Sequence, residues 1–179
     1  GQYSFIRTWT ADAMDQCDNP ASVSCDQLIT VEDTTDPTID LAAADLTVEC
    51  DGAGNSDQLA AWLADNGGAE ASDNCSAVTW SHSDATLSDL CGATGAVTVT
   101  FTATDDCGNS SETTATFTIE DTTNPSIDTD AADQTVECDG AGNTDALNAW
   151  LASHGGAAAS DICGGVTWSN DFTALSDDC

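Results

Sequence analysis

Cysteines are the side chains in this sequence whose chemistry is most distinctive. The 179 residues contain nine, about 5 %, and four recur at broad spacing in one stretch: Cys50, Cys75, Cys91 and Cys107. They lack the Cys-x-x-Cys pairs and nearby histidines that are typical of a zinc site. This usage indicates disulfide bonds formed in an oxidising, extracellular place. Reactive or metal-binding thiols are the alternative.

Acidic residues are the second group that could do chemistry. The chain has 32 Asp+Glu against 1 Lys+Arg, a net charge of −31. Calcium takes six to eight oxygen ligands, and crowded carboxylates repel each other unless a cation compensates them. We therefore expect calcium to bind among acids in turns, with solvated surface charges as the alternative reading. The candidate ligands are Glu49, Asp51, Asp105, Asp106, Glu120 and Asp121.

The charge balance excludes several classes of protein. Arg7 is the single strong cation, so a nucleic-acid binder is excluded and docking on anionic membranes is disfavoured. No apolar run approaches the ~20 residues of a membrane span, so we expect no membrane insertion. The acids recur along the chain in turns, and His82 and His154 each align with an asparagine in the other repeat, so we expect no enzyme.

An internal repeat organises these residues. Residues 33–91 superpose on 121–179 with a shift of 88 and 39 identities in 59 positions. The predicted domains are the C-terminal part of an upstream repeat (1–32), a complete repeat (33–120) and the first two-thirds of another (121–179). We expect the chain to be a window in a longer tandem array.

Apolar periodicity predicts the elements that must position these side chains. Apolar residues alternate with threonines over 97–104 and 114–119, which indicates two strands joined by a turn at 105–109. Three shorter strands are expected at 39–41, 46–50 and 78–80, and a helix over 57–65, capped by Ser56 and stopped by Gly67. The prediction is an all-β fold of tandem immunoglobulin-like sandwiches, with a short helix after the second strand of each repeat.

This fold suggests one of the three pairings that four cysteines allow. Cys50 ends the predicted second strand and Cys107 follows the strand expected to face it, so we predict Cys50–Cys107 and, by remainder, Cys75–Cys91. The following repeat would then contain Cys163–Cys179 and an unpaired Cys138. Cys17 and Cys25 would form a local bridge or stay partly unpaired.

Aromatic residues recur with the same period. Trp62, Trp80, Trp150 and Trp168 have apolar neighbours in phase, which favours packing in the core over exposed rings that stack on sugars. The threonine ladder over 98–104 is typical of a solvent-facing strand, and an ice-binding or glycan-binding face is the weaker alternative.

The motifs Leu-Thr-Val-Glu-Cys50, Asp73-Asn-Cys75, Asp106-Cys-Gly-Asn109 and the Glu120-Asp-Thr-Thr-Asn-Pro125 boundary resemble hyalin-repeat (HYR-like) modules of giant secreted proteins of Bacteroidota, including adhesins of gliding bacteria. The first 32 residues depart from the other repeats. The resemblance implies an immunoglobulin-like fold, a cell-surface or extracellular location and a structural or adhesive role without catalysis. It also implies O-glycosylation at Thr34 and Thr122, within Asp-Thr-Thr sequences.

The sequence therefore predicts a disulfide-bonded, calcium-rigidified stalk segment of a large extracellular adhesin or surface filament. Its partners would be neighbouring repeats of the same chain and, in a fibre, other copies of the chain. The alternative is a glycan-binding or self-binding module.

Overall fold

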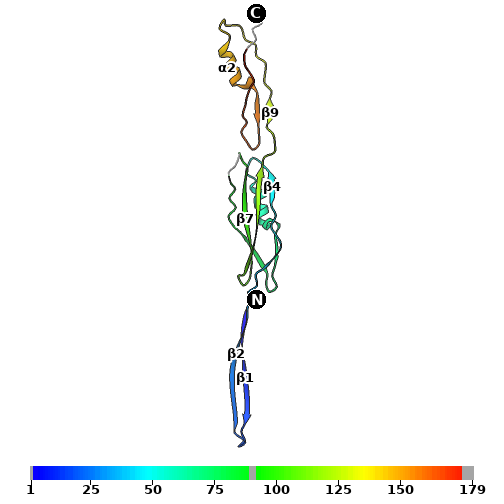
Figure 1. Ribbon diagram of the computed structural model, residues 1–179, viewed down its shortest axis with the longest axis vertical. Coiled ribbons are helices and arrows are strands. Elements are labelled where there is room, and N and C mark those ends of the chain that lie inside the picture. The colour runs from blue at the N-terminus through cyan, green and yellow to red at the C-terminus, as the bar shows by residue number, and fades with distance from the viewer. Residues whose placement is uncertain (1, 89–91, 175–179) are drawn as a thin grey trace. The chain divides into compact units, whose positions relative to one another are not determined.

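The computed structural model describes residues 2–88 and 92–174 (Figure 1). They divide into two compact units that interleave along the chain. Unit 1 takes its described residues from Gly1–Leu46, Ala60–Ala85 and Thr98–Thr116, and unit 2 from Thr47–Leu59, Thr86–Val97 and Phe117–Cys179. Most ordered segments are β-strands in sheets, as the all-β class predicts. None of the helices in the described ranges is long and apolar enough to cross a membrane.

The chain begins with a hairpin of two long strands, β1 (Tyr3–Met14) and β2 (Pro20–Val31). They pair antiparallel from Tyr3↔Val31 to Met14↔Pro20, and both appear in blue in Figure 1. Asp15 closes the turn because its Oδ1 accepts the backbone N–H groups of Cys17 and Asn19 at 2.8 and 2.9 Å. The side chains of this hairpin are exposed or half-buried throughout.

A four-stranded sheet has the order β4-β8-β7-β6. Its long central strands are β7 (Gly95–Asp105) and β8 (Ser110–Glu120), and β4 (Leu46–Glu49) and β6 (Val78–His82) lie at the edges. Burial alternates along β7 and β8 because successive side chains of a strand point to opposite faces. The predicted strands and their threonine-rich outer faces are confirmed. The inward residues that form the core are Val97, Val99, Phe101, Ala103, Ala115, Phe117 and Ile119.

A short helix, α1 (Ser56–Ala64), covers part of this core, close to the predicted span. Trp62 is 7 % exposed and meets Phe101 of β7 edge to face, with ring centroids 5.3 Å apart. Gly67, in the 3-10 turn η1 (Asn66–Gly68), has a φ of 66°. A Cβ there would lie 3.1 Å from Phe101 Cε2, so glycine is required both by conformation and by space. A small second sheet pairs β3 (Thr38–Leu41) with β5 (Glu70–Ser72).

Four elements of the C-terminal region follow their counterparts by 88 residues. They are β9 (Ser126–Thr129), α2 (Thr144–Ala152), the 3-10 turn η2 (His154–Gly156) and β10 (Ala158–Ser160). Strands β9 and β10 pair antiparallel, as β3 and β5 do. Within the described residues after Ser160 there is no further strand.

Candidate functional site

One disulfide is formed among the described cysteines, and it joins Cys50 to Cys163. Their Sγ atoms are 2.11 Å apart, their Cα atoms 6.1 Å apart, and 113 residues separate them in sequence. Cys50 follows β4 and is 4 % exposed, and Cys163 lies in the loop after β10 and is 5 % exposed. Both belong to unit 2. The bond therefore links a cysteine of the segment 33–120 to one of the segment that begins at residue 121.

The predicted pairing of Cys50 with Cys107 is wrong. Cys107 lies in the turn that joins β7 to β8, whereas the N–H of Cys50 donates to the carbonyl of Glu120, at the far end of β8. Eleven residues of strand separate these places by about 35 Å. A disulfide requires Cα atoms roughly 4.4–6.8 Å apart, so the two cysteines cannot meet.

The remaining predictions for the cysteines have different outcomes. The pair Cys163–Cys179 is also wrong, because Cys163 is bonded to Cys50. Cys17 and Cys25 form no bridge, since Cys25 faces Trp9 across the hairpin while Cys17 lies in its turn. Cys138 likewise has no disulfide. The pair Cys75–Cys91 is not decided, because Cys91, like Cys179, falls outside the described residues.

A recurring Asp-x-Cys turn positions the cysteines. In each case Oδ1 of the aspartate accepts the N–H of the cysteine two residues later, at 2.8 Å. Such a side-chain bond imitates a backbone turn and fixes the direction of the cysteine side chain. The four pairs are Asp15 with Cys17, Asp73 with Cys75, Asp105 with Cys107, and Asp161 with Cys163. The spacing is visible in the sequence, but its role was missed.

Glu49, which precedes Cys50 of the disulfide, forms hydrogen bonds to residues 122–123. Its carboxylate accepts the N–H of Thr122 at 2.9 Å, the hydroxyl of Thr122 at 2.8 Å and the hydroxyl of Thr123 at 2.9 Å. The backbone N–H of Thr122, followed by the two hydroxyls, holds the pKa of Glu49 below its ordinary value. Glu49 therefore binds backbone and hydroxyl groups of residues 122–123. The Thr122 hydroxyl, a predicted glycosylation position, is the donor in one of these bonds; that of Thr34 lies in an exposed segment.

The six acids predicted to hold calcium do not converge. Asp105 and Asp106 lie at the turn of the β7–β8 hairpin, whereas Glu120 and Asp121 lie at its opposite end, so these four acids do not share one site. Asp51 closes its own loop, because its Oδ1 accepts the N–H groups of Ala53 and Asn55 at 2.7 and 3.0 Å. The backbone N–H groups of Ala53 and then Asn55 lower the pKa of Asp51.

Asp105 nevertheless belongs to an acidic cluster with two aspartates that are not among the predicted ligands. Carboxylate oxygens of Asp33 and Asp105 and Sγ of Cys107 lie within 4.8 Å of one another, as do oxygens of Asp33 and Asp73 and Sγ of Cys75. All five residues belong to unit 1. Nothing in the local pattern separates Asp33 and Asp73 from the other acids, because only the tertiary structure brings residues 33, 73 and 105 together. Asp33 lies in no strand, and its carbonyl accepts Asn109 Nδ2 at 3.3 Å.

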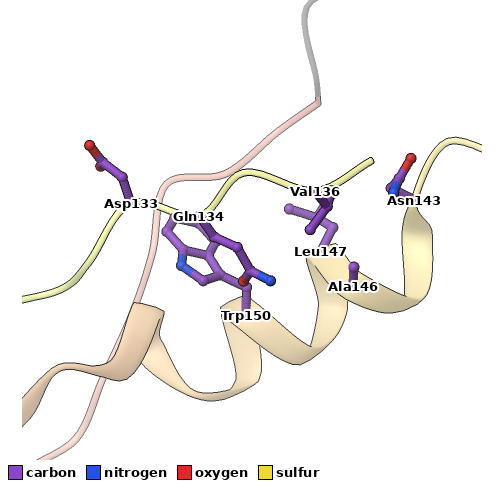
Figure 2. A pocket seen from close by; sticks show the side chains of 7 residues that line it. All are labelled: Asp133, Gln134, Val136, Asn143, Ala146, Leu147 and Trp150. Atoms are coloured by element: carbon purple, nitrogen blue, oxygen red, sulfur yellow. The ribbon is translucent and has the colours of Figure 1, made fainter. Parts of the chain in front are cut away.

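An open cavity of about 370 Å³ lies beside helix α2 (Figure 2). Ala146, Leu147 and Trp150 reach it from the helix, and Val136 points toward Leu147 from the segment that runs over the helix. Asp133, Gln134 and Asn143 complete its lining. Trp150 Nε1 donates to Ala132 O at 3.0 Å, just as Trp62 Nε1 donates to Ala44 O at 3.2 Å. The two helices are therefore anchored alike, and Trp62 also packs edge to face against Phe101 of β7.

The tryptophan prediction holds in part. Trp62 is buried, as expected, and Trp80 and Trp150 are half-buried. Trp168 is 38 % exposed and stacks on the His154 ring with centroids 4.7 Å apart, so its predicted burial is wrong.

Comparison with known proteins gives no relative from which an activity could be carried over. No protein-family model and no curated protein matches this chain.

Proposed function

We propose that this chain is a non-catalytic, tension-bearing spacer: a segment of an extracellular stalk built from tandem 88-residue, immunoglobulin-like repeats. The observation that carries the proposal is the Cys50–Cys163 disulfide. The proposed repeats meet at residues 120–121, and this bond joins a cysteine before the boundary to one after it. A force applied along the chain would pass through the covalent bond instead of through the residues between the two cysteines.

Non-covalent contacts reinforce the same boundary. The N–H of Cys50 donates to Glu120 O at 2.8 Å, and Glu49 holds Thr122 and Thr123 through three hydrogen bonds. Ala93 N–H donates to Cys163 O at 3.1 Å. The bonds of Glu49 and Ala93 tie residues on both sides of the boundary to each other within unit 2, and the bond of Cys50 holds the end of β8 just before the boundary. A repeat boundary restrained in this way suits a spacer, because a spacer must transmit tension without unfolding.

The sequence supports the same role. The resemblance to hyalin-repeat modules implies a surface location and a structural or adhesive part, and the 88-residue recurrence suits a chain that gains length by repetition. The high content of cysteine is consistent with an oxidising compartment.

Single-molecule force spectroscopy on the chain, held at its two ends, tests the proposal. In the oxidised protein, the 113-residue separation between Cys50 and Cys163 should contribute no length under force. The double variant Cys50→Ser/Cys163→Ser should gain a further contour length of about 370–410 Å, from ~3.3–3.6 Å per extended residue.

The matched control is Cys138→Ser, which alters the position equivalent to Cys50 in the following segment and leaves the disulfide intact. It should extend like the oxidised parent chain. If the oxidised parent extends as far as the double variant, the bond does not carry the load and the proposal is wrong.

A further inference from the structure

Three aspartates from distant parts of the sequence meet in unit 1. Asp33 lies ahead of β3, Asp73 follows β5, and Asp105 ends β7. A carboxylate oxygen of Asp33 lies within 4.8 Å of one of Asp105 and within 4.8 Å of one of Asp73. Asp33 and Asp105 are 6 % and 5 % exposed. Carboxylates this close and this poorly solvated repel each other more strongly than carboxylates in water.

The hydrogen bonds of these carboxylates leave two oxygens unused. Asp105 is satisfied, because Oδ1 accepts the N–H groups of Cys107 and Asn109 and Oδ2 accepts Asn109 Nδ2 at 2.8 Å. Oδ1 of Asp33 accepts Thr35 N–H, and Oδ1 of Asp73 accepts Cys75 N–H. Oδ2 of Asp33 and Oδ2 of Asp73 are both buried and have no hydrogen-bond partner in the part of the chain that the structure describes. Buried polar atoms are rarely left in this state without a ligand or an ion.

The chain has no spare positive side chain to compensate these oxygens. Arg7 is the single Lys or Arg in the sequence, and its guanidinium stacks 4.2 Å above the ring of Trp9. A cation from solution would supply the positive charge that these oxygens lack.

We propose that Asp33 and Asp73 bind a calcium ion through their unpartnered Oδ2 atoms, with the carboxylate of Asp105 within 4.8 Å of that of Asp33. The site shares one residue, Asp105, with the ligands expected from the sequence. It does not depend on the tension-bearing role, because it belongs to unit 1, whereas the disulfide belongs to unit 2.

The ligand chemistry favours calcium over a softer metal. The two oxygens left without a partner are carboxylate oxygens, which calcium prefers. Structural zinc sites are instead built from cysteine and histidine ligands.

Calorimetric titration of the oxidised full chain, first stripped with EDTA, tests the site with calcium chloride as the probe. We expect one saturable site in unit 1, and at least a tenfold loss of its affinity in Asp33→Asn and in Asp73→Asn. Asparagine keeps the Oδ1 acceptor for the N–H of Thr35 or Cys75, so these variants preserve the local turns. Asp121→Asn is the matched control, since Asp121 occupies the position equivalent to Asp33 but is exposed; it should leave the affinity of this site unchanged.

Thermal melting supplies a second readout that does not require tight binding. In EDTA, Asp33→Asn should melt at or above the parent temperature, because it removes a repelling charge. In excess calcium the order should reverse, and sodium chloride of equal ionic strength should not reproduce this reversal. Three outcomes would each overturn the proposal. The first is no saturable calcium binding, and the second is unchanged affinity in both aspartate variants. The third is that the chain binds zinc in place of calcium and loses that binding in Cys107→Ser.

Discussion

At Glu49 a single carboxylate accepts three hydrogen bonds from two consecutive threonines, and the pKa of the carboxyl falls below its ordinary value as a result. The unfolded chain has no such donors, so it takes up a proton at Glu49 at a higher pH than the folded chain does. By linkage, the contribution of Glu49 to stability is complete above its unfolded pKa and is lost as the pH falls through the folded one.

Glu49→Gln should therefore reduce the dependence of stability on acid. The variant should have a lower urea midpoint than the parent at pH 7, because a neutral amide accepts these hydrogen bonds less strongly. The difference should shrink as the pH falls from about 5 toward 3, as measured by urea unfolding at each pH. Glu137→Gln, at the equivalent position 88 residues later, is the control. If both variants lose the same stability at pH 7, the threonine contacts of Glu49 do not contribute.

At the scale of an element, the loop that precedes helix α1 depends on Asn55. This side chain is fully buried, donates from Nδ2 to Glu49 O at 2.8 Å and accepts Asp51 N–H at 3.1 Å. Asn143 makes the same two bonds ahead of α2, to Glu137 O at 2.7 Å and from Asp139 N–H at 3.2 Å. The two asparagines also share a left-handed backbone, with φ of 50° and 51°. They differ in burial, because Asn143 is only half-buried.

Asn55→Ala should therefore cost more than Asn143→Ala. A buried carbonyl and a buried N–H left without partners cost about 1–3 kcal/mol, whereas water can reach the same groups around Asn143. The strain of alanine at positive φ is common to both variants and cancels in the comparison. Urea unfolding of the two variants measures the difference, and equal losses would show that burial of Asn55 does not strengthen these bonds.

At the scale of the whole molecule, the 88-residue equivalence between segments predicts where a second disulfide would form. Cys138 is equivalent to Cys50 and has no disulfide. The bonded partner of Cys50 lies 113 residues later, so the equivalent partner of Cys138 would lie in a further repeat.

Appending a second copy of residues 92–179 after Cys179 continues the repeat in register. We expect Cys138 to form a disulfide with the appended copy of Cys163, and the fluorescence of Trp150 to shift toward that of a buried indole. Peptide mapping under non-reducing conditions identifies the bond. A disulfide across a loop of this length would stabilise by roughly 4.7 kcal/mol in the chain-entropy model. An alkylated, unpaired Cys138 in the extended chain would contradict the proposed repeat pattern.

Local patterns in the sequence were enough to predict the strands of the β7–β8 hairpin and helix α1. Alternating apolar and threonine residues over 97–104 determine which side chains face inward, because a strand turns each residue through half a rotation. Helix α1 lies close to the predicted span, but the prediction of Ser56 as its cap is wrong: Ser56 is the first helical residue, and Asn55 precedes it with its carbonyl accepting Leu59 N–H at 3.0 Å. The partner of Cys50 and the convergence of Asp33 with Asp73 were decided by tertiary structure. Both depend on which ends of distant strands meet, and sequence spacing cannot distinguish the two ends of an eleven-residue strand, which lie about 35 Å apart.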